Sequence, residues 1–535
     1  MLDAAIVGAG FSGLYMLHRL REAGLQARVL ERGGDVGGTW YWNRYPGARC
    51  DIESVDYCYS FSDELLREWR WTERYAAQPE ILAYLQHVAD RLDLRRDIEL
   101  DTTVIAATWD EADLAWTLAT QHGERITARW LILAVGNLSA VKRPDVPGLE
   151  DFAGEWHHTA RWPRDGVDLA GRRVAVIGTG STGIQAVTEI AKEADRLSVL
   201  QRTPNYSMPA QNGPLPPEQL DEVISTYADR RRFAERSEAG VPFPSPTRAA
   251  LEVDDAERRR IYEEGWLRGG INALSYAFSD FFTDEQANRT AQDFARERIR
   301  EIVRDPRTAE ALCPAHHIGT KRTCVDTGYF ETFNRDNVEL VDLRREPLVR
   351  ITRRGIATAE RELDLDVIVF AIGFDAMTGA LLDIDVRGAD GLALREAWAA
   401  GPRTYLGLAA AGFPNLFMVT GPGSPSVLSN MAVSIEQHVD WIAECLVHLR
   451  DRGVRRIEPT AAAEEAWVRH VADVAAGTLY PAARSWYVGA NIPGKPRVFM
   501  PYVGGVGAYR RACDEVAVRG YEGFELAGAT TEARA

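Results

Sequence analysis

The sequence predicts an α/β fold with two Rossmann-like dinucleotide-binding domains, the second of which carries a helical insertion. The first observation is a strand at residues 4–7, a glycine-rich loop, a helix and a second strand at residues 27–30. The second is the same pattern with strands at residues 173–177 and 197–200. The third is size, since 535 residues with 46% hydrophobic side chains are enough for roughly two to four domains. Repeated strand–helix–strand units predict parallel sheets covered by helices.

The first unit has the residues of a dinucleotide site. An apolar strand at residues 4–7 is followed by Gly8, Gly10 and Gly13 and then by a helix. Such glycines permit a tight turn, close approach of the backbone to a pyrophosphate, and close packing of a helix whose N-terminus attracts phosphate. Glu31 ends the next strand, where its carboxylate can accept hydrogen bonds from ribose hydroxyls. We therefore predict a bound dinucleotide here.

The second unit differs at the position that selects the cofactor. Gly178, Gly180 and Gly183 follow its first strand, but the next strand ends in Arg202-Thr203, without an acid. A guanidinium and a hydroxyl favour the 2′-phosphate of NADP(H) over NAD(H). Two such units in one chain predict a bound flavin dinucleotide in the first and a mobile nicotinamide cofactor in the second. Hydride transfer to the flavin is the expected partial reaction.

Composition divides the chain into three stretches. A segment rich in Pro and Gly at residues 142–148 breaks regular structure and favours a boundary near residue 140. Residues 213–307 are charged and helix-favouring, which predicts a helical insertion that forms a lid or wall. Because one strand–helix–strand half cannot cover a flavin, we expect the chain to return to the first domain after residue 374. The predicted domains are 1–139 and 375–535 for the flavin and 140–374 for NADP, with a frayed tail from about Ala527.

Charge and composition exclude several classes of protein. The chain has 62 Lys and Arg against 78 Asp and Glu, and the net charge of −16 would repel nucleic acid and anionic lipid. The apolar runs are far shorter than the roughly 18 residues that a membrane span needs, and an apolar strand begins by Ala4. We therefore expect a cytoplasmic protein with no membrane span and no secretory signal. The six cysteines form no CxxC pair and no cluster with histidine, which argues against disulfides, a redox dithiol and a metal site.

Two longer motifs carry a resemblance to a known family. Residues 152–163 (FAGEWHHTARWP) match the pattern FxGxxxHxxxWP just before the second glycine loop, and residues 37–51 match a second pattern of the same family. With both glycine loops in register, the chain resembles the type I Baeyer–Villiger monooxygenases over essentially its whole length. Three further segments resemble the phenylacetone and steroid monooxygenase branch, namely residues 421–431, Lys321-Arg322 and Ser485-Trp486-Tyr487.

The resemblance implies a tightly bound FAD, NADPH as electron donor, and O2. The implied reaction converts a ketone to an ester or lactone through a C4a-peroxyflavin and a tetrahedral (Criegee) adduct, with sulfides as a further class of substrate. It also makes Arg322 and Asp51 the catalytic residues. A guanidinium suits this role because it keeps its proton and offers several donors to a developing oxyanion. Asp51 would hold Arg322 in place, and Trp486 would lie on a mobile control loop at about residues 483–501 that folds over the nicotinamide.

The resemblance assigns binding residues to matching positions. The expected FAD contacts are Gly8, Gly10, Ser12, Gly13, Glu31, Thr39, Trp40, Tyr41, Trp42, Asp51, Tyr57, Val104 and Met431. The expected NADP contacts are Gly178, Gly180, Ser181, Thr182, Gly183, Arg202, Thr203, Lys321, Arg322 and Trp486. The residues expected at the ketone pocket are Ser426, Val427, Leu428 and Met431, and those expected to organise the interdomain linker are Phe152, Gly154, His158, Trp162 and Pro163. No metal is expected.

Two other functions stay open. A related flavin monooxygenase that oxidises nitrogen or sulfur would share both glycine loops, although Trp162-Pro163 and the Asp51–Arg322 pair favour a ketone oxygenase. A non-catalytic NADPH-binding redox sensor would lack the reactive arginine. The expected partners are a small-molecule ketone and O2, with no nucleic acid and no membrane, and the expected state is a monomer or weak homo-oligomer.

Overall fold

The larger of two sheets is built around the N-terminal strand. The computed structural model describes residues 1–528 of the chain. The eight-stranded sheet has the order β17-β4-β5-β6-β1-β2-β3, and β18 is also paired with β6. Its strands are β1 (Leu2–Val7), β2 (Ala27–Leu30), β3 (Ile98–Glu99), β4 (Val104–Asp110), β5 (Ala115–Thr120), β6 (Arg125–Leu133), β17 (Asp385–Arg387) and β18 (Leu416–Met418).

Strand β6 belongs to two parts of this sheet at once. Its first half pairs antiparallel with β5, whereas its second half pairs parallel with β18, with Leu131 opposite Leu416. On its other side β6 is parallel to β1, with Leu133 opposite Val7. The carboxyl ends of β1, β6 and β18 therefore meet at one edge of the sheet, which is where ligands bind in open α/β sheets.

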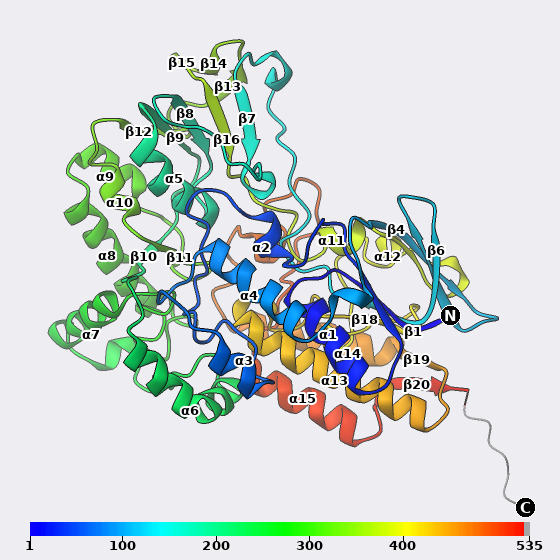
Figure 1. The fold of residues 1–535 in the computed structure, drawn as a ribbon. Coiled ribbons are helices and arrows are strands. Elements are labelled where there is room, and N and C mark those ends of the chain that lie inside the picture. The colour runs from blue at the N-terminus through cyan, green and yellow to red at the C-terminus, as the bar shows by residue number, and fades with distance from the viewer. Residues whose placement is uncertain (529–535) are drawn as a thin grey trace, which may run out of the picture.

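The second sheet is wholly parallel and forms the upper lobe in Figure 1. Helix α5 (Ser181–Glu193) covers one face, and a small antiparallel sheet packs on the other, so strand β8 is a nearly continuous apolar run. The order is β12-β9-β8-β16-β7, with bounds β7 (Glu155–His158), β8 (Arg173–Ile177), β9 (Arg196–Gln201), β12 (Val338–Asp342) and β16 (Val367–Phe370). The small sheet comprises β13 (Leu348–Ile351), β14 (Gly355–Thr358) and β15 (Glu362–Asp364).

Helices cover the larger sheet and form the insertion. Helix α13 (Met431–Asp451) packs against α1 (Phe11–Glu22) in one core, and the Asn430 side chain caps α13 by accepting from the Ala432 N–H. The insertion holds α6 (Pro217–Arg236), α7 (Asp255–Arg268), α8 (Glu285–Ile302) and α9 (Pro306–Leu312). The remaining elements are α2 (Thr39–Trp42), α3 (Asp63–Glu68), α4 (Gln78–Arg91), α10 (Tyr329–Thr332), α11 (Gly379–Leu382), α12 (Leu394–Ala397), α14 (Ala461–Ala476), α15 (Val506–Val518), β10 (Ser207–Pro209), β11 (Cys324–Asp326), β19 (Arg456–Pro459) and β20 (Phe524–Ala527).

The chain crosses between the two sheets twice, and the crossings are hydrogen-bonded to each other. Val141 and Phe374 form an antiparallel bridge. The Asp375 N–H donates to the Ala140 carbonyl at 2.9 Å, and the Met377 N–H donates to the Asn137 carbonyl at 2.9 Å. We call residues 137–142 and 373–377 together the interdomain crossing.

The predicted fold class is confirmed, and the predicted strands at residues 27–30 and 173–177 have the observed bounds. Strands β17 and β18 lie after residue 374 and join the first sheet, while the domain boundaries themselves stay a prediction. Most of the predicted tail lies outside the described residues. Ala527, where the tail was expected to begin, ends strand β20 and pairs with Arg456 of β19, so it is not frayed.

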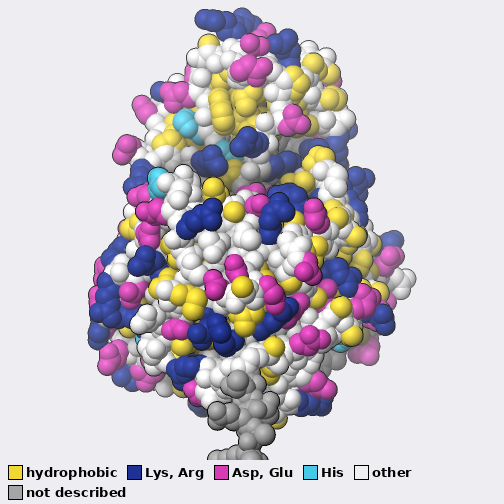
Figure 2. Space-filling model, turned by 90° about the vertical axis from the view of Figure 1, so that its right-hand side faces the viewer, with side chains coloured by type: hydrophobic (Ala, Val, Ile, Leu, Met, Phe, Trp, Pro, Cys, Tyr) yellow, Lys and Arg dark blue, Asp and Glu magenta, His cyan; other side chains and the backbone are white. Residues whose placement is uncertain are grey.

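Two surface properties bear on partners. Over residues 1–528, no helix is both long enough and apolar enough to span a bilayer. The face shown in Figure 2 carries acidic and basic side chains interspersed, so the excess of negative charge does not form a single acidic face on this side.

Candidate functional site

The first glycine loop is shaped by close backbone contacts. Gly8 has φ +106°, and a Cβ there would lie 2.6 Å from the Ala134 carbonyl oxygen. A Cβ on Gly13 would lie 1.8 Å from the Gly8 carbonyl oxygen, so neither position tolerates a side chain. Gly10 is the N-cap of α1, and no side chain of the described residues caps this helix. The free N–H groups at its start fit a pyrophosphate.

Glu31 ties this loop together at the end of β2. Its side chain is buried, with Oε2 accepting from the Ala9 N–H and Oε1 from the Gly33 N–H, both at 2.7 Å. Each carboxylate oxygen has a second lone pair, which leaves capacity for ribose hydroxyls. The residues present therefore fit a dinucleotide.

The second glycine loop repeats this geometry and adds open space. Gly178 has φ +110°, and a Cβ there would lie 2.4 Å from the Ala371 carbonyl oxygen. A Cβ on Gly183 would lie 2.0 Å from the Gly178 carbonyl oxygen, whereas one on Gly180 would meet no described atom within 4 Å. The open side of Gly180, at the N-terminus of α5, is where a phosphate would approach.

A cluster of cations lies beside this second loop. Burial and the charges of Arg202 and Arg484 lower the pKa of Lys321. Burial and the charge of Arg202 also lower the pKa of Lys142. Like charges held this close are unfavourable unless an anion lies between them. The cluster brings together Arg202 and Lys321, which the sequence analysis assigned to the 2′-phosphate, and adds Lys142 and Arg484.

Arg322 and Asp51 form a bidentate ion pair. Arg322 Nε donates to Asp51 Oδ2 and Nη2 to Oδ1, both at 2.8 Å, and the two side chains are 24% and 18% exposed. Burial lowers the pKa of Arg322, but the charge and hydrogen bonds of Asp51 outweigh this and raise it well above its ordinary value. Arg322 Nη1 also donates to the Val427 carbonyl at 2.8 Å. The guanidinium is therefore permanently charged and fixed in orientation.

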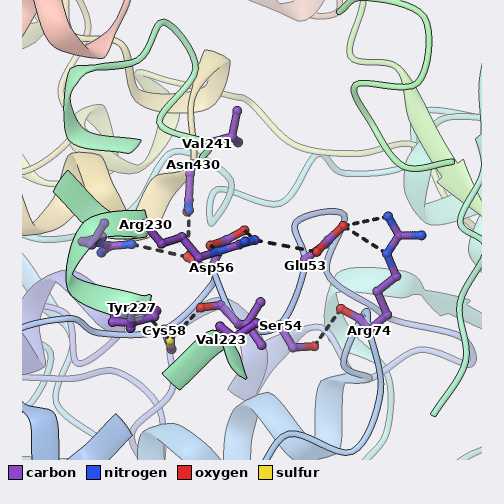
Figure 3. A network of polar contacts seen from close by, with 12 residues as sticks. Glu53, Ser54, Asp56, Cys58, Arg74, Val223, Tyr227, Arg230, Val241 and Asn430 are labelled. Atoms are coloured by element: carbon purple, nitrogen blue, oxygen red, sulfur yellow. Dashed lines mark hydrogen bonds and ion pairs between the residues drawn. The ribbon is translucent and has the colours of Figure 1, made fainter. Parts of the chain in front are cut away.

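The segment after Asp51 is anchored from three sides, as Figure 3 shows. Arg230 of helix α6 forms a bidentate pair with Asp56 at 2.7 and 2.6 Å. Arg74 forms a second pair with Glu53 at 3.0 and 2.7 Å. Asn430 Nδ2 donates to the Asp56 carbonyl at 2.7 Å. These contacts fix the backbone that directly follows Asp51, one of the two predicted catalytic residues.

A buried ion pair joins the insertion to the first domain. Arg231 of α6 contacts Glu436 of α13, and each side chain is only 7% exposed. Glu436 also accepts from the Ser60 N–H at 2.6 Å and from the Ser60 hydroxyl. Burial lowers the pKa of Arg231, but Glu436 outweighs it and raises that pKa well above its ordinary value. Neither charge is stable at this depth without its partner.

A cavity of about 230 Å³ opens beside Arg322. Val427 and Leu428, two of the four predicted pocket residues, lie in its wall, but Ser426 and Met431 do not. Ser426 is fully buried with φ +36°, and Met431 begins α13 and packs against the core of the first domain. Most of the remaining wall comes from residues 271–283 of the insertion and 478–505 near the C-terminus.

The predicted control loop is tied to the interdomain crossing. Lys495 Nζ contacts Asp375 Oδ1 and donates to the Ala376 carbonyl at 2.8 Å. Asn491 Nδ2 donates to the Phe374 carbonyl at 2.7 Å, and Lys142 Nζ donates to the Asn491 carbonyl at 3.2 Å. Trp486 lies on the same loop and packs in a small core that includes Val427 and Tyr487.

The remaining predicted FAD contacts lie on several elements of the first part of the chain. Ser12 is in α1, Val104 begins β4, and Trp40 Nε1 donates to the Tyr57 hydroxyl at 3.3 Å. Thr39, Trp40, Tyr41 and Trp42 make up helix α2. In the second unit, Ser181, Thr182 and Gly183 begin α5, and the Thr203 carbonyl accepts from the Thr179 hydroxyl at 3.2 Å.

The linker motif forms an edge of the second sheet. Phe152 and Gly154 precede β7, and a Cβ on Gly154 would lie 2.5 Å from the Asp366 carbonyl oxygen. Trp162 is buried in the core beneath this sheet, directly before Pro163. Burial and the charge of Arg161 lower the pKa of His158 to about 4, so its imidazole is neutral near pH 7.

Sequence reasoning missed three parts of the site. The Arg231–Glu436 pair joins residues that are 205 apart in the chain, and no local pattern marks it. The contact between Arg322 and Val427 uses a backbone carbonyl, which residue type does not reveal. The cavity walls come from loops, in which hydrophobic periodicity gives no signal. No cluster of three metal-ligating side chains occurs in the described part of the chain.

Comparison with known proteins covers nearly the whole chain. The family model of pyridine nucleotide-disulphide oxidoreductases matches residues 5–229. An acetone monooxygenase (methyl acetate-forming) of Gordonia sp. is 44% identical over 98% of this chain and 99% of its own. A Baeyer–Villiger monooxygenase of Pseudooceanicola batsensis is 43% identical over 97% and 95%. A phenazine N-monooxygenase of Lysobacter antibioticus is 42% identical over 98% and 97%.

Solved structures agree with these relatives. An oxidised steroid monooxygenase bound to NADP superimposes with a TM-score of 0.95 at 53% identity, covering 98% of this chain and 99% of that one. The OTEMO complex with FAD and NADP has a TM-score of 0.95 at 40% identity, with the same coverage. The fold and both dinucleotide cofactors are thus those of these neighbours.

We predict that replacing Arg231 by Met destabilises the cofactor-loaded protein by about 3–5 kcal/mol, because Glu436 is left charged and buried without its partner. Urea unfolding followed by circular dichroism measures this. The matched control is Arg232→Met on the same helix, whose pair with Asp229 is exposed and contributes at most about 1 kcal/mol. Equal losses for the two variants would contradict the prediction.

We predict that stability falls as the pH drops below about 6.5. Burial lowers the pKa of His438 to about 3, and its Nδ1 accepts from the Thr420 N–H at 2.9 Å. The unfolded chain binds this proton near pH 6.5 and the folded chain does not, so each such histidine costs about 1.4 kcal/mol per pH unit below that value. In unfolding measured between pH 6.5 and 5, His438→Gln should flatten the slope by that amount, while the exposed His122→Gln should not.

Proposed function

This chain belongs to the Baeyer–Villiger monooxygenases, and on that premise we propose that it inserts one oxygen atom beside the carbonyl of a small ketone. In the balanced reaction, ketone, O2, NADPH and a proton give an ester or lactone, NADP⁺ and water. The observation that carries the proposal is the Arg322–Asp51 pair, which lies at a cavity between two loops shaped for dinucleotides.

FAD, when bound, accepts the hydride of NADPH and activates O2 for transfer to the ketone. The residues proposed to hold it are those of the first glycine loop, Glu31, and the segment around α2. Glycine at positions 8 and 13 and the uncapped start of α1 support this assignment. The protein's own residues contribute by placing charges beside the reacting groups and by excluding water from them.

Arg322 is proposed to stabilise the negative charge that develops on the ketone oxygen and on the oxidant. Its pKa is raised by Asp51, so it holds its proton throughout the cycle and cannot quench an anion by donating one. Its hydrogen bonds to Asp51 and Val427 fix the plane of the guanidinium before the substrate arrives. Charge that is already oriented needs no reorganisation during the reaction.

Asp51 is proposed to position Arg322 instead of transferring protons. Both carboxylate oxygens accept from the guanidinium. Asp51 lies directly before the anchored segment that contains Glu53 and Asp56, so its backbone has little freedom. A carboxylate held rigidly in this way keeps the guanidinium in the position and orientation that stabilisation of the transition state requires.

Electron supply is proposed to come from NADPH bound at the second loop. The cluster of Arg202, Lys321, Lys142 and Arg484 would surround the 2′-phosphate, which is the anion that these mutually repelling cations need. Trp486, on a loop tied to the interdomain crossing, would cover the nicotinamide. O2 is the proposed co-substrate, and the cytoplasm and a monomeric or weakly oligomeric state stay predictions.

Oxidation at nitrogen is the second candidate. It is supported by the phenazine N-monooxygenase, which is about as similar to this chain as the ketone-oxidising relatives are. The two reactions make different demands, because a nitrogen lone pair attacks the oxidant without generating an oxyanion on the substrate. The fixed cation at Arg322 favours the ketone, and Arg322 variants separate the two functions.

We predict that Arg322→Ala lowers ester formation from a simple ketone by about a thousandfold. One unit charge about 4 Å away is worth roughly 4 kcal/mol at an effective dielectric of about 20. Arg322→Lys, which keeps the charge but not the bidentate pair, should retain intermediate activity. Ester yield by mass spectrometry and flavin content by absorbance measure both variants. An Arg322→Ala enzyme that retains its flavin and forms ester within tenfold of the parent rate contradicts the assigned role.

We predict that Arg202→Ala raises KM for NADPH about tenfold and leaves KM for NADH nearly unchanged, because only NADPH carries the 2′-phosphate. Steady-state oxidation of each cofactor measures this. The control is Arg307→Ala, an exposed arginine on α9, which should change neither KM. Equal effects on the two cofactors would place the phosphate site elsewhere.

A further inference from the structure

The cavity beside Arg322 has one uncompensated charge in its wall. Its charged lining residues are Arg322 and Glu238. Arg322 is already paired with Asp51. Glu238 is an exposed residue, has no Lys, Arg or His side chain within ion-pair distance among residues 1–528, and accepts a side-chain hydrogen bond at Oε2 only from the Ser245 hydroxyl, at 3.2 Å. The carboxylate of Glu238 is therefore the one charge of the wall without a charged partner.

The backbone holds Glu238 in place at the junction of α6 and α15. The Val506 N–H donates to the Glu238 carbonyl at 2.9 Å, and the Gly507 N–H donates to the Ser237 carbonyl at 3.0 Å. Gly505 has φ +89°, and a Cβ there would lie 3.2 Å from Glu238 Cγ. Only glycine at position 505 leaves room for the Glu238 side chain in this position.

Tyrosines line the same cavity as Glu238 and Arg322. Tyr480 lines the cavity, and its pKa is raised far above its ordinary value by burial, with Tyr487 and Glu238 raising it further and Arg322 lowering it. Tyr480 is therefore within electrostatic range of both charges. Tyr276 lines the same cavity, and burial and then Glu238 raise its pKa. The wall of one cavity thus combines a guanidinium, phenol rings and a carboxylate.

This set of groups has a defined ligand chemistry. Tyrosine faces attract quaternary and protonated ammonium groups, and a neighbouring carboxylate adds a direct charge interaction. The same carboxylate repels an anionic substituent. A neutral alkyl group of equal size gains only the free energy of burying its apolar surface in the cavity.

We propose that the cavity selects ketones that carry an ammonium group remote from the carbonyl, with the carbonyl at Arg322 and the ammonium between Glu238, Tyr276 and Tyr480. The inference rests on the proposed function, since the oxygen insertion is unchanged and only the choice of ketone is new. The ammonium group binds and does not react.

The test uses three ketones that differ only at the far end of one chain. One ends in trimethylammonium, one in the tert-butyl group that is its neutral isostere, and one in a carboxylate. A quaternary nitrogen has no lone pair, so it cannot be oxidised in place of the ketone. We expect kcat/KM for ester formation to be about fivefold higher for the cation than for the isostere at low salt, and lower for the carboxylate than for either. Added NaCl should reduce both differences.

Glu238→Gln should lower the ratio of cationic to neutral ketone, because only the tyrosine faces then favour the cation. The matched control is Glu235→Gln, which removes the same charge from α6 at a residue outside the cavity wall and should leave the ratio as it is. Binding of the trimethylammonium ketone and of its isostere, measured by calorimetry without NADPH, gives a readout that does not depend on turnover. The same preference should appear there and be reduced in Glu238→Gln.

The outcomes separate this inference from the proposed function. If the neutral ketone gives no ester, the proposed function fails. If the neutral ketone is converted but the cation has no advantage, or if its advantage is undiminished in Glu238→Gln or at high salt, the inference about Glu238 fails while the function stands.

Discussion

The Arg322–Asp51 ion pair is the interaction on which the rest of the site depends. A guanidinium this poorly exposed is costly unless a carboxylate neutralises it, and the same carboxylate decides where it points. The two partners are 271 residues apart in the chain, so the pair depends on tertiary structure and not on local sequence. The ion pairs around Glu53, Asp56 and Glu436 are consequences of that requirement, because they fix the loop that supplies the acid.

Secondary structure could be predicted from the sequence where the pattern lies within a few neighbouring residues. Residues 27–30 and 173–177 are continuous apolar runs next to glycine loops, and both are strands with those bounds. Arg322 and Asp51 were named only through a family resemblance, and the structure brings them into contact, although their roles stay proposals. The resemblance also assigns Ser426 and Met431 to the ketone pocket, together with Val427 and Leu428. A single turn of 3-10 helix points adjacent side chains in different directions, so Val427 and Leu428 reach the cavity and Ser426 does not.

The position of the insertion could not be predicted from the order of the elements along the chain. Helix α6 lies between strands of the second sheet in sequence, yet Arg230 and Arg231 are bound to residues of the first domain and of α13. Two ion pairs, one of them buried, hold it there. The insertion that supplies part of the cavity wall is therefore joined through α6 to the segment after Asp51 and to α13, which only non-local contacts reveal.

The loop that carries Trp486 is fastened to the interdomain crossing through Lys495, Asn491 and Lys142. Its anchors are the two segments of the interdomain crossing, which connect the two sheets. A rotation of one sheet against the other about these segments would therefore shift the loop as well. The proposed cover over the nicotinamide is in this way coupled to the angle between the two sheets.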